Sequence, residues 1–177
     1  EIIEDSDQLG NPIVAGSIMK NNKIINVSGL GNSGMFLKTA VLDDVITNAT
    51  TGSIIDVSGS NNIGMRMDLG TLVSTGAPTG KNEGTIEITS GNDNIGMLAN
   101  GKNSTGAVQA INSGDINIKG GITNSAISSL NGGNIENTGN IKIESPVIKS
   151  IGMYIESGST GTGTGNITVT GNGNTAI

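Results

Sequence analysis

Short runs of alternating apolar and polar residues recur along the chain at nearly constant intervals. Each run has Ile, then a polar residue, then Ile or Val, and successive runs begin 30, 31, 30, 25 and 26 residues apart. The six runs are Ile25–Val27, Ile55–Val57, Ile86–Ile88, Ile116–Ile118, Ile141–Ile143 and Ile167–Val169. A period of two is typical of a β-strand with one buried face. The pattern therefore predicts one such strand in each of six repeats.

A second motif follows each run, seven to nine residues after the run begins. It contains Asn or Ser, a variable residue, Gly or Ala, and then Met or Ile. The six copies are Asn32–Met35, Asn62–Met65, Asn94–Met97, Asn124–Ile127, Ser150–Met153 and Asn174–Ile177. Alternation resumes after the small residue, which predicts a second strand per repeat. A third, weaker strand is expected at Val108–Ile111 and Asn134–Asn137.

Gly, Asn, Ser and Thr fill the segments between these runs, as expected for turns. The Gly-rich stretch from Gly161 to Gly165 reads as a turn, since it lacks the Lys and the helix of a phosphate-binding loop. No segment shows a sustained helical period, although Thr39–Ile46 could form one helical turn. The chain is therefore expected to be all-β.

Repeats of 24–32 residues with two or three strands match one coil of a parallel β-helix, a solenoid in which each strand pairs with its copy in the next coil about 4.8 Å away. About six coils are expected over residues 21–177, and residues 1–20 are expected to form an incomplete preceding coil or a segment that leads into the coils. The first Ile of each run and the Met or Ile of the second motif would form inward columns. The recurring Asn residues would stack as a structural turn ladder, with each amide bonded to its neighbours above and below; these are Asn32, Asn62, Asn94, Asn124 and Asn174. Because no polar cap ends the array, a fragment of a longer array is expected.

Composition limits the chemistry of the chain. Gly occurs 29 times, Tyr and Phe occur once each, and Trp, Cys and His are absent. Because Cys and His are absent, a zinc site is not expected. No other cofactor is expected either. The net charge of −6, with nine Lys and Arg residues, argues against nucleic acid as a partner. No apolar window is long enough for a membrane-spanning helix.

The repeated motifs also resemble a known family. Gly139-x-Ile-x-Ile143, followed by Ile151-Gly-Met-Tyr154, is similar to the repeats in passenger domains of autotransporters from fusobacteria and related anaerobes. The resemblance covers residues 21–177. It implies a right-handed parallel β-helix that a C-terminal barrel carries through the outer membrane, and a role as a surface adhesin. It also implies localisation at the bacterial cell surface, anchored to the outer membrane or secreted.

One row of side chains is the candidate partner-binding surface. The outward residues of the second strand should lie above one another on one exposed face; they are Phe36, Arg66, Leu98, Ser128 and Tyr154. Aromatic residues and Arg commonly anchor interfaces, although scattered surface residues are the plainer reading. The expected partners are an unidentified host or bacterial surface protein or glycan and the remainder of the same passenger chain. Further binding surface is expected in longer turns such as Leu69–Glu83.

Two alternative functions remain open. Parallel β-helices also include polysaccharide-degrading enzymes, which need two carboxylates roughly 5–9 Å apart. Asp56 and Glu87 should be neighbours on adjacent coils, but no His or third carboxylate accompanies them, so they are expected to be solvated surface acids, like Asp43-Asp44. A trimeric phage tail fibre or tailspike is the other alternative. The leading hypothesis is a non-catalytic β-helical stalk or adhesin segment, and no catalytic or metal-ligating residue is assigned.

Overall fold

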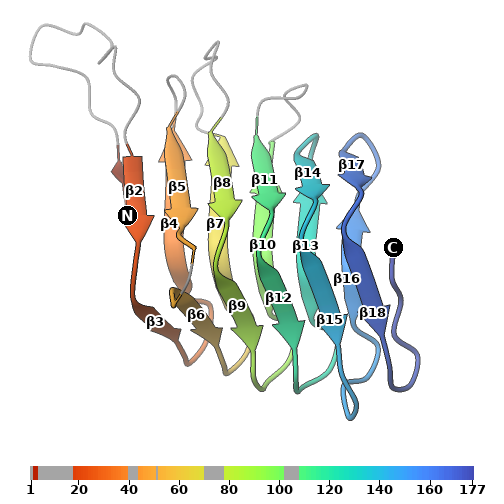
Figure 1. Cartoon of the computed structure of the whole chain (residues 1–177). Coiled ribbons are helices and arrows are strands. Elements are labelled where there is room, and N and C mark those ends of the chain that lie inside the picture. Colours follow the sequence, from red (N-terminus) through yellow and green to blue (C-terminus); the bar gives the residue numbers. More distant parts are fainter. Residues whose placement is uncertain (1, 4–17, 40–43, 51, 70–77, 102–107) are drawn as a thin grey trace, which may run out of the picture.

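The computed structural model describes residues 2–3, 18–39, 44–50, 52–69, 78–101 and 108–177. These residues form β-strands and connecting turns, and they contain no helix. The strands build three parallel sheets, which we call sheets A, B and C. Figure 1 shows how corresponding strands follow one another from one side of the molecule to the other.

Each sheet contains six strands of the described residues, and neighbouring strands in a sheet are three elements apart in the chain. Sheet A consists of β1 (Ile2–Ile3), β4 (Ser33–Thr39), β7 (Ile63–Leu69), β10 (Ile95–Asn100), β13 (Ser125–Leu130) and β16 (Ile151–Ile155). Sheet B consists of β2 (Ile18–Asn21), β5 (Val45–Asn48), β8 (Thr79–Asn82), β11 (Gln109–Asn112), β14 (Asn134–Asn137) and β17 (Thr160–Gly163). Sheet C consists of β3 (Ile24–Val27), β6 (Ile54–Val57), β9 (Thr85–Ile88), β12 (Asp115–Ile118), β15 (Asn140–Ile143) and β18 (Asn166–Val169).

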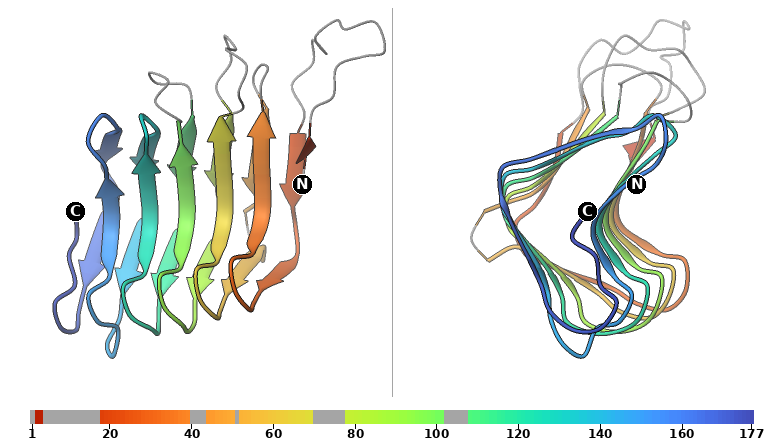
Figure 2. Two further views of the ribbon diagram at one scale, coloured as in Figure 1. Left: turned by 180° about the vertical axis from the view of Figure 1, so that it is seen from behind. Right: turned by 90° about the vertical axis from the view of Figure 1, so that its right-hand side faces the viewer.

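The strand register confirms the expected parallel solenoid. In sheet C, Ile55 lies opposite Ile25 on one side and Ile86 on the other, and the column continues through Ile116 and Ile141. Viewed along the stack, successive coils superimpose around one common interior (Figure 2, right). The right-handed sense and the number of coils stay predictions.

Inward side chains of the three sheets fill that interior. The Met and Ile residues expected to face inward from sheet A are buried; they are Met35, Met65, Met97, Ile127 and Met153. They meet the Ile and Val columns of sheet C in one apolar cluster. Ile25 and Ile167 are only partly buried, because each lies in an outermost strand of sheet C. Aliphatic and thioether side chains therefore pack this core without aromatic rings.

Sequence reasoning assigned several local segments wrongly. Thr160–Gly163 is strand β17 rather than a turn, because its backbone pairs with β14. Val45 and Ile46 belong to strand β5 rather than to a helical turn, and Ala40–Asp43 lie outside the described residues. In the expected binding turn Leu69–Glu83, Thr79–Asn82 forms strand β8, and residues 70–77 lie outside the described part of the chain. Asp44, which was expected to be solvated, is fully buried.

The first twenty residues also contribute to the sheets. Ile2 and Ile3 pair with Leu37 and Lys38 at the edge of sheet A. Strand β2, which begins at Ile18, pairs with β5 at the edge of sheet B. The described parts of this segment therefore continue the same parallel stacking.

Candidate functional site

The predicted row on the outer face of sheet A is present as a row. Phe36 lies opposite Arg66, Arg66 opposite Leu98, Leu98 opposite Ser128, and Ser128 opposite Tyr154. The residues before and after each of them, such as Met65 and Met67, point into the core. Period-two alternation therefore placed these five side chains together on one face of the sheet.

The row is not exposed along its whole length, contrary to expectation. Tyr154 is 41% exposed, but Leu98 is 5% exposed and Ser128 only 2%. Phe36 and Arg66 are half-buried. A side chain that points outward from the sheet is not necessarily exposed. Strands of adjacent coils are about 4.8 Å apart, so a long side chain can cover a small or apolar side chain in the next strand. The accessible part of the row is therefore its two ends.

Arg66 is held by two neighbours at one end of the row. Its Nε and Nη2 donate hydrogen bonds of 3.1 and 2.7 Å to the same Asp68 oxygen, Oδ2. Its guanidinium carbon also lies 5.2 Å from the centre of the Phe36 ring, within cation–π range. Asp68 is buried, so this pair is screened less than an ion pair in open solvent. The guanidinium is thus positioned before any partner arrives, as an anchor residue should be.

The asparagines of the second motif stack at the turn that leads into sheet A. The backbone N–H of Asn62 donates to Oδ1 of Asn94 at 2.9 Å, and the N–H of Asn94 donates to Oδ1 of Asn124 at 2.8 Å. Asn32 donates in the same way to Asn62, and Ser150 donates to Asn174. The expected ladder between adjacent coils is therefore present, and each amide oxygen accepts its hydrogen bond from the backbone of the preceding coil.

The amide groups of this ladder also hold the turns themselves. Nδ2 of Asn94 donates to the carbonyl of Ser90 in its own turn and to the carbonyl of Gly59 in the preceding coil. Nδ2 of Asn124 donates to Gly120 and Gly91 in the same way. One side chain thus satisfies turn carbonyls in two coils, which explains why the motif repeats an amide at this place.

Sequence reasoning missed a second ladder at the corner between sheets B and C. Its members lie at the ends of the sheet B strands and are buried; they are Asn21, Asn48, Asn82, Asn112 and Asn137. Here Nδ2 of each amide donates to Oδ1 of the next at 2.7–2.9 Å. The available signal was an Asn two residues before the Gly that precedes a sheet C strand, as in Asn82, Asn112 and Asn137. Unlike the outer ladder, this inner ladder is bonded from amide to amide.

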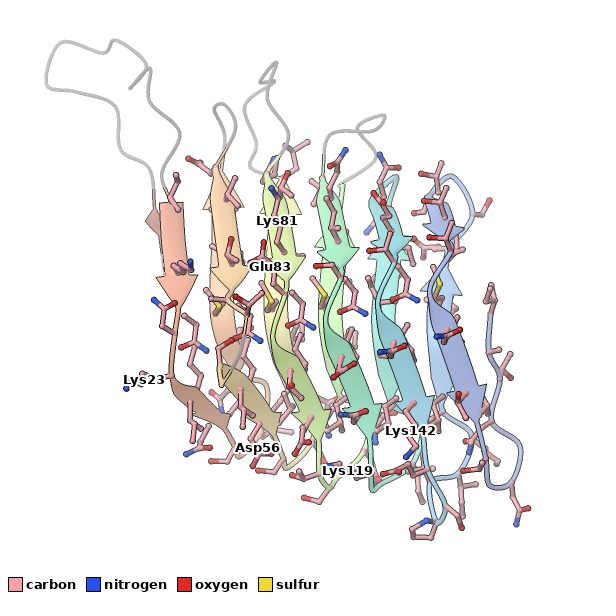
Figure 3. All side chains as sticks on the ribbon, in the orientation of Figure 1. Lys23, Asp56, Lys81, Glu83, Lys119 and Lys142 are labelled. Carbon is pink, nitrogen blue, oxygen red and sulfur yellow. The ribbon has the colours of Figure 1, made fainter. Side chains whose placement is uncertain are left out.

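The two carboxylates considered for catalysis are neighbours, as predicted, but both have partners. Asp56 and Glu87 lie opposite each other in the register of β6 and β9. Thr89 donates a 2.9 Å hydrogen bond to Asp56, and Lys119 lies 2.5 Å from Glu87. Figure 3 shows Asp56, Lys119 and Lys142 in the lower part of the stack, near the strands of sheet C. Each carboxylate therefore has a partner on the surface of sheet C.

The charges on sheet C form a surface network. The hydrogen bond to Glu87 raises the pKa of Lys119 above its ordinary value, with weaker support from the charges of Glu144 and Asp56. The hydrogen bond from Lys142 lowers the pKa of Glu144. Both directions favour the charged forms at neutral pH. The network consists of paired charges on the surface of sheet C.

The described residues contain no group of His, Cys, Asp and Glu side chains that could hold a metal ion. Within the same residues, no helix is long and apolar enough to cross a membrane. Comparison with known proteins gave no matching family model, no matching curated protein and no matching solved structure.

Proposed function

We propose that this chain is a non-catalytic β-helical stalk or adhesin segment of a secreted bacterial surface protein, in the manner of an autotransporter passenger. The observation that carries the proposal is the uninterrupted parallel stacking of the described strands, with six in each of three sheets. Such stacking gives an elongated, stiff module in which each coil contacts mainly its neighbours. A module of this kind supports adhesion by holding binding surfaces away from the cell.

The partner-binding part of the proposal rests on the ends of the outer row of sheet A. Arg66 is oriented by Asp68 and Phe36, and Tyr154 is exposed at the other end. Arg and Tyr are common anchors in protein interfaces. The expected partners are a surface protein or glycan and the adjoining coils of the same passenger.

The genomic context tests the autotransporter assignment directly. The gene should encode a signal peptide upstream of this segment and an outer-membrane β-barrel downstream. Finding a cytosolic open reading frame without either would contradict the assignment. A trimeric mass in solution would instead favour a phage tail fibre or tailspike.

A binding comparison tests adhesion. The complete surface protein should bind host cells or immobilised surface ligands, and this 177-residue chain should be assayed beside it. Equal binding by the two would locate adhesion in this segment, whereas binding only by the complete protein would make the segment a spacer. Loss of binding in Arg66→Ala and Tyr154→Ala, but not in Lys23→Ala, would locate the contact on sheet A.

The enzymatic alternative depends on Asp56 and Glu87. It predicts release of reducing ends from a polysaccharide, and abolition of that release in Asp56→Asn and Glu87→Gln. We expect no release by either the parent chain or the variants. Turnover that these substitutions abolish would overturn the non-catalytic proposal.

A further inference from the structure

The outer face of sheet C carries a shallow trough over its last three strands, β12, β15 and β18. The trough has a volume of about 470 Å³, and Ile141 and Ile167 are among the residues that line it. Two outward columns of polar side chains form its walls; they are Asp115, Asn140 and Asn166 on one side and Asn117, Lys142 and Thr168 on the other. The trough therefore runs across successive coils, parallel to the axis of the stack.

Few of the side chains along the trough are charged. Its walls contain one acid, Asp115, and one base, Lys142, and Lys142 is paired with Glu144 at 2.5 Å. The other four wall residues are three Asn and one Thr. Together, the wall side chains supply both donors and acceptors of hydrogen bonds, with one acid and one base among them. The trough thus suits a ligand that is rich in hydroxyl or amide groups and carries no net charge.

One wall of the trough is ordered before any ligand binds. Nδ2 of Asn166 donates to Oδ1 of Asn140 at 3.2 Å, and Nδ2 of Asn140 donates to Asp115 at 2.9 Å. This chain of hydrogen bonds fixes three side chains along the axis. A ligand that contacts them loses less binding free energy to side-chain ordering than it would with free surface amides.

The composition of the same columns changes along the stack. The positions that precede Asp115 in its column are Ile24, Ile54 and Thr85, and those that precede Asn117 are Asn26, Asp56 and Glu87. The earlier positions therefore hold two Ile, one Thr, two acids and a single amide, and the amide-rich surface begins at β12. Because the backbone course is shared, this difference is a property of the side chains and not of the fold.

The class of ligand follows from what the trough contains. It has no aromatic residue and no Arg, which are the usual anchors of protein partners. It has no excess of positive charge to bind the phosphates of a nucleic acid. We propose that this trough binds an uncharged polysaccharide strand lying along the stack, with its hydroxyl groups bonded to the amides of successive coils. This inference deepens the adhesive part of the proposed function and rests on that function being non-catalytic.

The test uses the 177-residue chain and defined neutral oligosaccharides. Binding of cellohexaose, xylohexaose, mannohexaose and chitohexaose is measured by calorimetry, with a polygalacturonate oligomer as the charged comparison. We expect at least one neutral hexasaccharide to bind, and Asn140→Ala and Asn117→Ala each to weaken its affinity about tenfold, which corresponds to the loss of one or two hydrogen bonds. Asn26→Ala is the matched control, since Asn26 occupies the Asn117 column in β3 and should leave the affinity unchanged.

Three outcomes would overturn the trough as a glycan site. They are no binding of any neutral hexasaccharide at millimolar concentration, equal affinity in the parent chain and both trough variants, and preference for the charged oligomer. If Asn140→Ala does not fold, as judged by circular dichroism, the Asn117→Ala variant alone decides between these results. Release of reducing ends during the titration would contradict the non-catalytic function but not the binding site. Failure of the proposed glycan site and failure of the proposed non-catalytic function therefore give different results.

Discussion

Ser129 is a buried hydroxyl group without a partner in the core of the solenoid. It points inward from β13, next to Ala99 in the register of sheet A, and its Oγ makes no hydrogen bond. A buried hydroxyl group that loses its water partners costs about 1–3 kcal/mol when nothing replaces them. Sequence alone did not indicate this cost, because Ser is ordinary in a strand of mixed polarity.

Ser129→Ala is therefore expected to stabilise the chain. The free energy of unfolding should rise by about 1 kcal/mol, since the substitution removes the unsatisfied group and leaves a residue that already occupies the neighbouring coil. Denaturant titration measures the change. The matched control is Ser128→Ala, which removes the 2.8 Å hydrogen bond from Ser128 to Ser125 and should lower stability. Equal or lower stability in Ser129→Ala would show that its hydroxyl group is satisfied.

Gly91 lies where two successive turns come into close contact. It has a φ of +85°, and a Cβ atom built there would lie 1.5 Å from the carbonyl oxygen of Gly59. Gly31 also has a positive φ, of +73°, but its Cβ position is open. The two glycines therefore separate the cost of backbone conformation from the cost of a steric clash.

Gly91→Ala is expected to destabilise the chain by about 3 kcal/mol or more, because the turns of two coils must move apart. Gly31→Ala should cost about 1–2 kcal/mol, which is the penalty for the left-handed conformation alone. Both values come from urea unfolding followed by circular dichroism. Similar costs for the two variants would mean that the stack relaxes freely at Gly91.

At the scale of the element, the inner asparagine ladder fixes sheet B against sheet C. Asn112 accepts a hydrogen bond from Asn82 and donates one to Asn137, each at 2.7 Å. The ladder stops at the last strand of sheet B, where Gly163 lies opposite Asn137. All its members are buried, so each amide is either bonded to its neighbours or left unsatisfied.

Asn112→Ala is expected to cost about 3 kcal/mol, because it removes two buried hydrogen bonds and leaves Oδ1 of Asn137 without its donor. Asn32→Ala provides the comparison, since Asn32 lies exposed at the start of the outer ladder. Its loss should cost about 1 kcal/mol or less. Thermal and denaturant unfolding of both variants measures the difference, and a smaller cost for Asn112→Ala would contradict the structural role of the inner ladder.

The ion pairs of sheet C predict how stability depends on pH. The pKa of Glu144 is lowered in the folded chain, chiefly by Lys142, so its contribution is present above its ordinary pKa and is lost as the pH falls. The pKa of Lys119 is raised, chiefly by Glu87, so its contribution is present below its ordinary pKa and is lost as the pH rises through the folded value. The contribution of these two groups to the free energy of unfolding should be nearly constant between about pH 5 and 10 and should decrease below and above that range.

The variant Lys142→Gln tests the acidic limb of this profile. It removes the main cause of the lowered pKa of Glu144 while leaving the Glu87–Lys119 pair in place. The decrease in the urea midpoint from neutral to acid pH should therefore be smaller than in the parent chain, and the alkaline limb should be unchanged. The effect is small because the groups are exposed. An identical acidic limb in the two proteins would contradict the assignment.

At the scale of the whole molecule, stability should depend on position in the stack. Ile86 is fully buried between Ile55 and Ile116, whereas Ile167 has a partner only in β15 and is partly exposed. Ile86→Ala should cost about 3–4 kcal/mol in this chain, and Ile167→Ala about half of that or less. Hydrogen exchange should likewise be slowest in β9 and β12. Equal costs at the two positions would argue against stacking energies between neighbouring coils.

Sequence patterns predicted most of the fold because equivalent residues in a solenoid obey the same rule in every coil. The Ile columns of sheet C and the Met column of sheet A were predicted correctly, since period-two alternation identifies the inward face of each strand. The phase between the two motifs then fixed the register. Sheet B was the weakest prediction, because strands such as β17 alternate Thr with Gly and lack apolar residues.

For the candidate site, the sequence predicted that the side chains form a row but not which of them are exposed. Direction along a strand placed Phe36, Arg66 and Tyr154 together, but the burial of Leu98 depends on the size of its neighbours in adjacent coils. The inner ladder and the trough on sheet C were not predicted. Both arise from side chains 25–34 residues apart in the sequence that become axial neighbours only after the coils stack.

The sequence by itself determined which residues form the strands of sheets A and C and which of their side chains face inward. These properties follow from local alternation and from its repetition, and both are visible in a single chain. Only the tertiary structure decided that Thr160–Gly163 is a strand, that Asp44 and Leu98 are buried, and how the asparagines bond. Each of these depends on the neighbour that stacking brings to about 4.8 Å, where backbone pairing and side-chain volume override local preference.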